Sequence, residues 1–210
     1  FRDTQDLCDR ARLDRRELQA LAEAAALRGI AGHRHRARWE TAGVQPARDD
    51  LLAGVDGRDR QDSRAVAVRP PSARDDLVAD YRATGLTLGR HPVAFVRSEL
   101  RRRRARPARE VIAQNHGTRV RACGLVTLRQ RPQTANGTMF LTLEDESGSV
   151  NVVVWPRVWE RHRALVLGSG LLAVDGVLET DGDVHHLVAD RFHDFDPLLR
   201  GFRAASRDFC

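Results

Sequence analysis

Residues 124–156, GLVTLRQRPQTANGTMFLTLEDESGSVNVVVWP, indicate the fold of the C-terminal part. Apolar and polar side chains alternate in MFLTLED (139–145) and again in VNVVVW (150–155). A period of two is typical of strands that bury one face. The residues between them, ESGS (146–149), have the composition of a tight turn. This part of the chain therefore predicts a β-hairpin.

The residues on either side of the hairpin extend it to a barrel. RVRACGLVTLRQR (119–131) alternates as well and predicts an earlier strand, whose single face would hold Val120, Ala122, Gly124 and Val126. After the hairpin, Pro156 opens a helix, and LLAVDGVLE (171–179) and VHHLVADRF (184–192) predict a final hairpin. Three strands, a helix and two strands in this order indicate a five-stranded β-barrel of the OB-fold type.

The N-terminal part has helical periodicity instead. Residues 13–30 predict one helix, with Asp14 and Glu17 as a capping box and Gly29 as its stop, and a second helical stretch follows around Arg34–Trp39. Residues 41–74 are rich in Gly, Pro, Asp, Arg and Ser and lack an apolar period, which is typical of a poorly ordered linker.

Two helices are expected between the linker and the barrel, with a third short one after them. DDLVADYRATG (75–85) predicts a helix that ends at Gly85. Pro92 opens the next, which carries the arginine run RRRRAR (101–106) at its tail, and a short helix follows over 107–114. Helices followed by an all-β barrel place the chain in the α+β class.

Composition restricts the function classes. The 210 residues carry a net charge of +6, which fits a polyanionic partner, and all 35 basic residues are Arg, a bias that we attribute to genome base composition. The three cysteines show no C-x-x-C spacing, so we expect neither a disulfide framework nor a metal site. No apolar run reaches membrane-spanning length and no signal peptide is visible, so a cytoplasmic protein is expected. The chain begins with Phe1, which predicts a fragment of a longer protein.

Several segments resemble a known family in the right order. The 124–156 stretch closely resembles the OB domain of the family C DNA polymerase alpha subunits, and most of all their error-prone paralogue. TGLTLGRHP (84–92) resembles the segment before that domain, LDRRELQALAEAAAL (13–27) resembles the second half of the helix-hairpin-helix region, and SRDF (206–209) resembles the paralogue's chain end. The loop departs from its relatives at Asn136, where a basic residue is common.

The resemblance implies five regions. They are a partial helix-hairpin-helix region at 1–40, a linker at 41–74, a helical connecting segment at 75–117, the OB-fold at 118–195 and a C-terminal tail at 196–210. It also implies a C-terminal piece that positions single-stranded template DNA in damage-tolerant synthesis. The palm carboxylates of that family have no counterpart here, so we expect no catalytic residue, no cofactor and no enzyme activity in this chain alone. A protein-interaction module that docks translesion polymerase subunits remains the alternative.

Charge within the barrel suggests where nucleic acid binds. Residues 118–143 hold four arginines and no acid, whereas 144–192 hold four arginines and nine acids. OB-folds bind single strands across their second and third strands and the adjoining loops. The candidate residues are Arg119, Arg121, Arg129, Arg131, Thr134, Asn136, Phe140 and Trp155. The competing interpretation makes Phe140 a core residue and the arginines a solvated rim.

The arginine run supplies a second candidate, Arg101, Arg102, Arg103 and Arg104, which could hold phosphates. Its alternative is a helix end whose charge complements the helix dipole. Arg28, Gly29, Gly32 and Arg34 are weaker candidates in the partial helix-hairpin-helix region, with a purely structural role equally open. The histidines lack ligand spacing, and surface or partly packed positions are expected for them.

Overall fold

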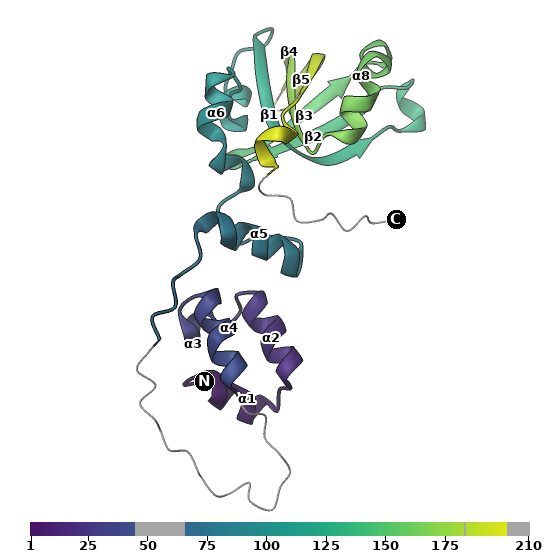
Figure 1. Ribbon diagram of the computed structural model, residues 1–210. Coiled ribbons are helices and arrows are strands. Elements are labelled where there is room, and N and C mark those ends of the chain that lie inside the picture. Colours follow the sequence, from purple (N-terminus) through teal and green to yellow (C-terminus); the bar gives the residue numbers. More distant parts are fainter. Residues whose placement is uncertain (45–65, 183, 201–210) are drawn as a thin grey trace, which may run out of the picture. The chain divides into compact units, whose positions relative to one another are not determined.

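A computed structural model describes residues 1–44, 66–182 and 184–200 (Figure 1). The chain divides into two compact units, one ending at Gly89 and one beginning at Arg90, and each is described by itself. Most of the predicted linker and most of the predicted tail, SRDF included, lie outside the described residues. Within the described ranges, no helix is both long and apolar enough to cross a membrane.

The first unit is a small helical bundle. Its helices are α1 (Thr4–Ala11), α2 (Arg15–Glu23), α3 (Arg28–Ala31), α4 (Arg34–Gly43) and α5 (Ala73–Thr84). α4 packs against the three helices before it, and α5 contacts α2. The buried side chains that form the core between α1 and α4 are Leu7, Cys8, Leu18, Ala22, Leu27, Ala31, Ala37 and Val44.

The prediction of one helix over 13–30 is wrong, although its capping box is confirmed at Asp14 and Glu17. α2 ends at Glu23, and Ala25 has a left-handed backbone with φ of 57°. Gly29 lies inside the short α3, and Gly32 ends that helix. Three consecutive alanines favour a helix, so the local sequence hides this break. The break lets Leu27 reach the core.

The second unit begins with short helical elements. η1 (Pro92–Phe95) and α6 (Arg97–Arg102) are separate, because Val96 leaves the helical region, so the single helix predicted from Pro92 is wrong. α7 (Ala108–Ile112) follows, as expected after Pro107.

The rest of the second unit is a closed barrel. Its strands are β1 (Arg119–Gln130), β2 (Met139–Asp145), β3 (Gly148–Val154), β4 (Leu171–Asp181) and β5 (Val184–Asp194), with α8 (Pro156–Gly168) between β3 and β4. They pair in the order β1-β2-β3-β5-β4, antiparallel except for the parallel pair of β3 and β5. The predicted fold class, N-terminal helices followed by a five-stranded OB-type barrel, is confirmed.

The hairpin turn is tighter than predicted. β3 begins at Gly148, opposite Asp145 of β2, so only Glu146 and Ser147 link the two strands. The Asp145 carboxylate accepts hydrogen bonds from the backbone amide and the hydroxyl of Ser147 at 2.7 Å. These two hydrogen bonds stabilise a two-residue turn, which is shorter than the four-residue turn ESGS predicted from the sequence.

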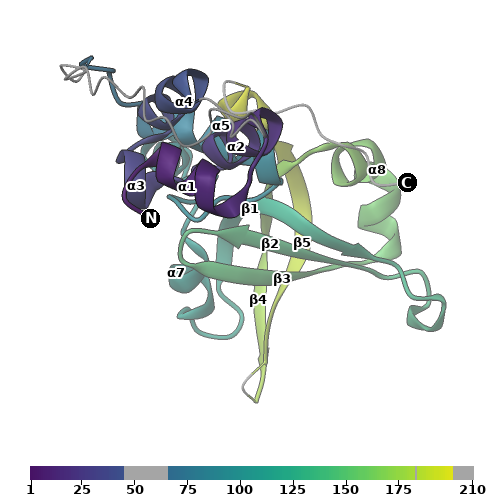
Figure 2. The ribbon, with the colours of Figure 1, turned by 90° about the horizontal axis from the view of Figure 1, so that it is seen from below.

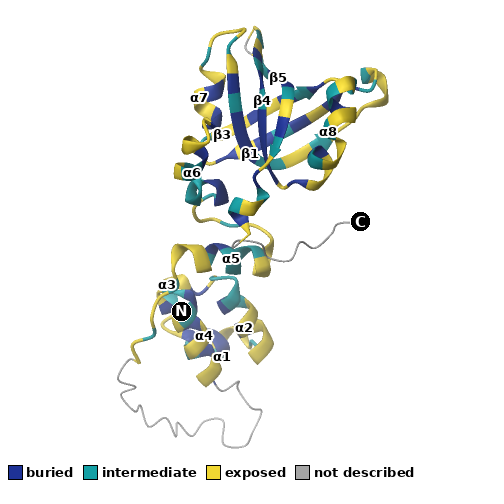
Figure 3. Ribbon diagram, turned by 45° about the horizontal axis from the view of Figure 1, so that its top comes forward, coloured by how far each residue is buried: buried dark blue, intermediate teal, exposed yellow. Residues whose placement is uncertain are grey.

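Two hydrophobic clusters support the barrel, whose strands and α8 are drawn in Figure 2 and whose buried residues are dark blue in Figure 3. The larger fills its interior with the inward residues of all five strands and is closed by Trp159 and Val166 of α8. The smaller lies outside the barrel wall, where Val93, Leu100 and Ala105 pack against Cys123, Leu171 and Ala173. The segment that carries the arginine run is therefore anchored on the barrel.

Candidate nucleic-acid interface

An outward-facing strand surface is formed by β2, β3 and the end of β1. We call it the strand face, and it consists of Leu128, Gln130, Phe140, Thr142, Asn151 and Val153. Phe140 pairs with Gln130 on one side and Val153 on the other. Its side chain is 36% exposed, so the interpretation of Phe140 as a core residue is wrong. Trp155 continues the alternation after Val153 and is 53% exposed.

A β-bulge decides which β1 residues reach the strand face. The register between β1 and β2 shifts between Val126, opposite Leu143, and Leu128, opposite Thr142. The extra residue reverses the alternation of side chains along the strand. Leu128 thereby becomes 43% exposed, and Val126 is the last residue of the predicted inward face.

Arg129 is displaced by the same bulge. It lies in β1 and pairs with the inward-facing Leu141. Its Nε donates to the carbonyl of Val166 at 2.8 Å and its second guanidinium nitrogen to that of Ser169 at 2.6 Å. Burial lowers the pKa of this guanidinium. Arg129 therefore completes the C-terminal end of α8.

The loop between β1 and β2 carries the remaining candidates of this group. Arg131 and Thr134 are exposed, and the Arg131 guanidinium lies 5.6 Å from the centre of the Trp159 ring. Asn136 has a left-handed backbone with φ of 48° and is followed by Gly137 with φ of 80°. Asn tolerates this region better than most residues, which gives a local reason for Asn at this position.

Arg119 and Arg121 lie elsewhere. They belong to the first half of β1, which pairs with β4 rather than β2. Arg121 forms two hydrogen bonds with the Asp175 carboxylate, at 2.5 and 2.7 Å, and a third with the carbonyl of Arg103. Arg119 pairs with Asp190 at 2.8 Å. The positively charged residues of 118–143 therefore lie at two separate places on the barrel rather than on one surface.

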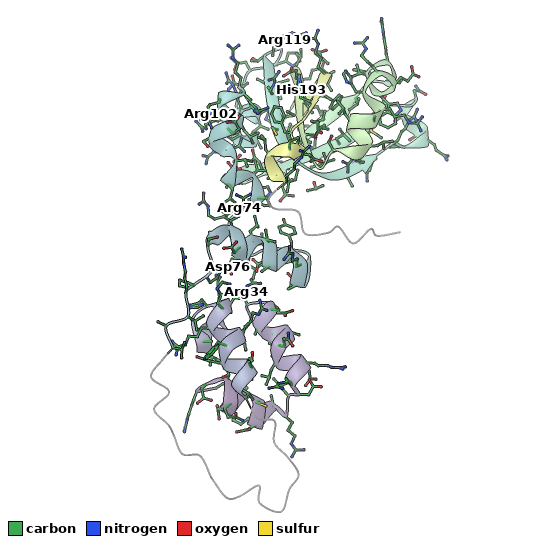
Figure 4. The ribbon with its side chains drawn as sticks, in the orientation of Figure 1. Arg34, Arg74, Asp76, Arg102, Arg119 and His193 are labelled. Atoms are coloured by element: carbon green, nitrogen blue, oxygen red, sulfur yellow. The ribbon has the colours of Figure 1, made fainter. Side chains whose placement is uncertain are left out.

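The arginine run lies beside these two residues. Arg101 and Arg102 end α6, Arg103 follows it, and Arg104 turns the chain with φ of 62°. Figure 4 labels Arg102 beside α6, and Arg119 and His193 on the barrel. All four arginines line one groove together with Arg119 and Arg121. Arg106 of the run lines it as well, together with Arg161 of α8 and Arg191 of β5, which sequence reasoning missed because they lie far from the run in the sequence.

The candidates of the first unit have structural partners. Arg34 is buried and donates to the carboxylates of Asp76 and Asp80 on α5 and to the carbonyl of Glu23 (Figure 4). Arg28 also pairs with Asp76, at 2.8 Å. Arg34 therefore joins α5 to the bundle and ends α2, which favours the structural alternative at this position.

Histidine and acidic side chains form no evident metal centre. In the described part of the chain, no three or more His, Cys, Asp or Glu residues are grouped so that they could hold a metal ion. His193 instead contacts the Asp175 carboxylate at 2.8 Å.

Comparison with known proteins gives matches both to the barrel and to the whole chain. Residues 120–194 match the family described as OB-fold nucleic acid binding domain. The whole chain is 52% identical over 209 residues to an error-prone DNA polymerase of Pseudomonas fluorescens (strain Pf0-1) and 49% identical to that of Pseudomonas aeruginosa. The chain spans 20% of the length of these relatives. The resemblance to error-prone DNA polymerases found in the sequence is confirmed.

Solved structures give a more distant likeness. A chain of asparaginyl-tRNA synthetase from Pyrococcus horikoshii covers 43% of this chain, at 22% identity and a TM-score of 0.37, over 23% of its own length.

Proposed function

We propose that this chain, similar throughout to error-prone DNA polymerases and equipped with an OB-fold nucleic acid binding domain, binds single-stranded DNA on its strand face. The observation that carries the proposal is the exposure of Phe140 and Trp155 on one side of the barrel. Aromatic rings on an OB surface stack on bases of any sequence, which suits a template strand.

The neighbouring polar groups support this assignment. Asn151 and Thr142, which are hydrogen-bonded to each other at 3.2 Å, supply polar groups between the apolar side chains. Arg131, Thr134 and Asn136 lie on the adjoining loop, where a backbone phosphate would pass. Arg129 is left out of the proposed contact set, because its guanidinium is bonded to the end of α8.

In the longer protein, this surface would hold single-stranded template near a polymerase active site that lies outside the chain. The activity of that protein would be template-directed DNA synthesis in damage-tolerant, mutagenic repair. The motivation is the identity of about half the residues to error-prone DNA polymerases over the full chain.

The test is anisotropy of a labelled oligo-dT with the full chain over a salt titration. Phe140→Ala and Trp155→Ala should each weaken binding, by about 1–3 kcal/mol per base that loses its stacking partner. Arg131→Gln should reduce the salt slope by about 0.7, the value for one phosphate contact on a single strand. Trp39→Ala is the matched control, because Trp39 is a similarly exposed tryptophan, 59%, on α4 of the other unit.

Two results would count against the proposal. One is oligo-dT binding by the double variant Phe140→Ala, Trp155→Ala that equals the parent at every salt concentration. The other is equal weakening by Trp39→Ala. If every variant kept the parent's affinity for oligo-dT and its salt slope, the alternative function would be favoured. That alternative is a module that docks partner subunits of a translesion assembly.

A further inference from the structure

The groove beside the arginine run is strongly charged. It has a volume of about 1270 Å³ and is lined by nine arginines and three carboxylates, an excess of six positive charges. It passes over β1, β4 and β5 and is bordered by residues 101–107 and by α8. Figure 3 shows these strands between α6 and α7 on one side and α8 on the other. Small-molecule sites of about 300–1,000 Å³ are enclosed and mostly apolar, so this groove suits an extended anion better.

The arginine run is fixed to the barrel rather than solvated as a free helix end. Leu100, which precedes the run, and Ala105 within it are buried, and the amide of Ala105 donates to the carbonyl of Leu100 at 2.9 Å. The amide of Arg106 then donates to the carbonyl of Arg121 on β1 at 2.9 Å. These contacts fix the backbone of the run against β1.

Arg121 organises the floor of the groove. Its guanidinium is held by Asp175 on β4 and donates to the carbonyl of Arg103 at 3.0 Å. A hydrogen bond from the Arg121 side chain lowers the pKa of Asp175 to about 2, so this carboxylate stays charged at neutral pH. Arg121 is therefore a positioning residue that ties the arginine run to β1 and β4.

Four arginines of the groove remain available to a ligand. Arg104, Arg106, Arg161 and Arg191 are exposed and have no ion-pair partner among the described residues. The other five are paired with Glu99, Glu110, Asp175 or Asp190. The unpaired guanidinium groups come from the run, α8 and β5, so they lie around the groove.

The groove has no aromatic side chain among its lining residues. A site for unpaired bases normally offers rings for stacking, whereas a site for a duplex needs only cations that follow phosphates. A duplex also presents about twice as many phosphates per length as one strand. The chemistry of the groove thus differs from that of the strand face.

We propose that this groove is a second nucleic-acid site, which holds the phosphate backbone of duplex DNA independently of base sequence. It stands apart from the single-strand binding proposed for Phe140 and Trp155. The chain would then hold paired and unpaired DNA on two surfaces of one barrel, as a primed template requires.

The test compares a labelled duplex with oligo-dT on the full chain. Arg104→Gln, Arg106→Gln and Arg191→Gln are combined, because these residues have no ion pair whose loss would perturb the fold. Each lost phosphate contact should lower the duplex salt slope by about 0.9 and weaken binding at 0.1 M salt about eight-fold. Oligo-dT binding should change far less. The Lys triple at the same positions should keep the parent's slope within one unit.

The matched control is Arg109→Gln, Arg163→Gln and Arg200→Gln, which removes three exposed charges outside the groove. If this control variant lost as much duplex binding as the groove variant, net charge alone would explain the effect, and the proposed site would be overturned. Unchanged duplex binding by the groove triple, or an equal loss of oligo-dT, would also overturn it. Loss of oligo-dT binding in the Phe140 and Trp155 variants is a separate outcome, so the two proposals can fail independently.

Discussion

Arg121 Nε lies 2.5 Å from Asp175 Oδ1, across the pair of strands β1 and β4. Arg121 and Asp175 are also partners in the strand register, so backbone and side chains bring them together. His193 contacts the second carboxylate oxygen at 2.8 Å. The carboxylate thus has partners on β1 and β5, the two neighbours of β4.

The pair predicts an acid-sensitive contribution to stability. The pKa of Asp175 is lowered from 3.8 to about 2, first of all by the Arg121 hydrogen bond. A carboxyl group with a lowered pKa stabilises the fold above its unfolded-state value, and this contribution disappears as the pH falls through the folded-state value. We expect about 1–2 kcal/mol, after allowance for partial solvent exposure.

The measurement is urea unfolding of Asp175→Asn and the parent between pH 7 and pH 2. The difference in free energy of unfolding should be constant above about pH 5 and shrink between pH 4 and pH 2. Glu160→Gln, an exposed change on α8, should show no such trend. A parent–variant difference that persists unchanged at pH 2 would contradict the assignment.

Arg129→Gln should reduce stability and leave the salt slope of oligo-dT binding unchanged. The variant removes both donors to the Val166 and Ser169 carbonyls, and unsatisfied buried groups cost about 1–3 kcal/mol. Chemical denaturation measures the loss, and Arg163→Gln on the exposed side of α8 is the control. A lower salt slope at unchanged stability would place Arg129 on the DNA instead.

Asp145→Asn should destabilise the second unit strongly. The Asp145 side chain is 1% exposed and accepts bonds from Arg97 at 2.7 Å and from the amide of Ala108 at 2.8 Å. Neutralising it leaves the guanidinium of Arg97 without one of its two carboxylate partners, and breaking a buried pair costs about 3–5 kcal/mol. Glu144→Gln, next to it but 49% exposed, should cost under about 1 kcal/mol in the same unfolding assay. Similar losses in both variants would contradict the buried role.

Gly176→Ala should be poorly tolerated. A β-carbon at Gly176 would overlap the carbonyl oxygen of Val188, a backbone atom of β5 that cannot move without displacing the strand. We expect a loss of about 3 kcal/mol, at the upper end for overpacking. Gly168→Ala, where nothing lies within 4 Å of the added carbon, is the control. Thermal unfolding compares the two variants. Equal midpoint temperatures would show that β4 and β5 separate readily to admit the added carbon, which would contradict the prediction.

Much of the fold follows from local sequence. The alternation in 139–145, the capping box at Asp14 and the stop at Gly85 all act through neighbouring residues, and the structure has each of them. The order of strands and helix also sufficed to predict the OB-type barrel, since few topologies accommodate that order.

Tertiary contacts decided what the alternation could not. Nothing local marks the bulge in β1, because an extra residue is accommodated by the register with β2 rather than by the residue itself. Because of the bulge, Leu128 faces outward and Arg129 bonds to the end of α8. A strict period of two would have placed Leu128 inside and Arg129 outside. The groove has the same origin. Arg104, Arg161 and Arg191 are distant in sequence, and only closure of the barrel brings them to one surface, since it pairs β1, which holds the run, with β4 of the final hairpin, and α8 packs against β5.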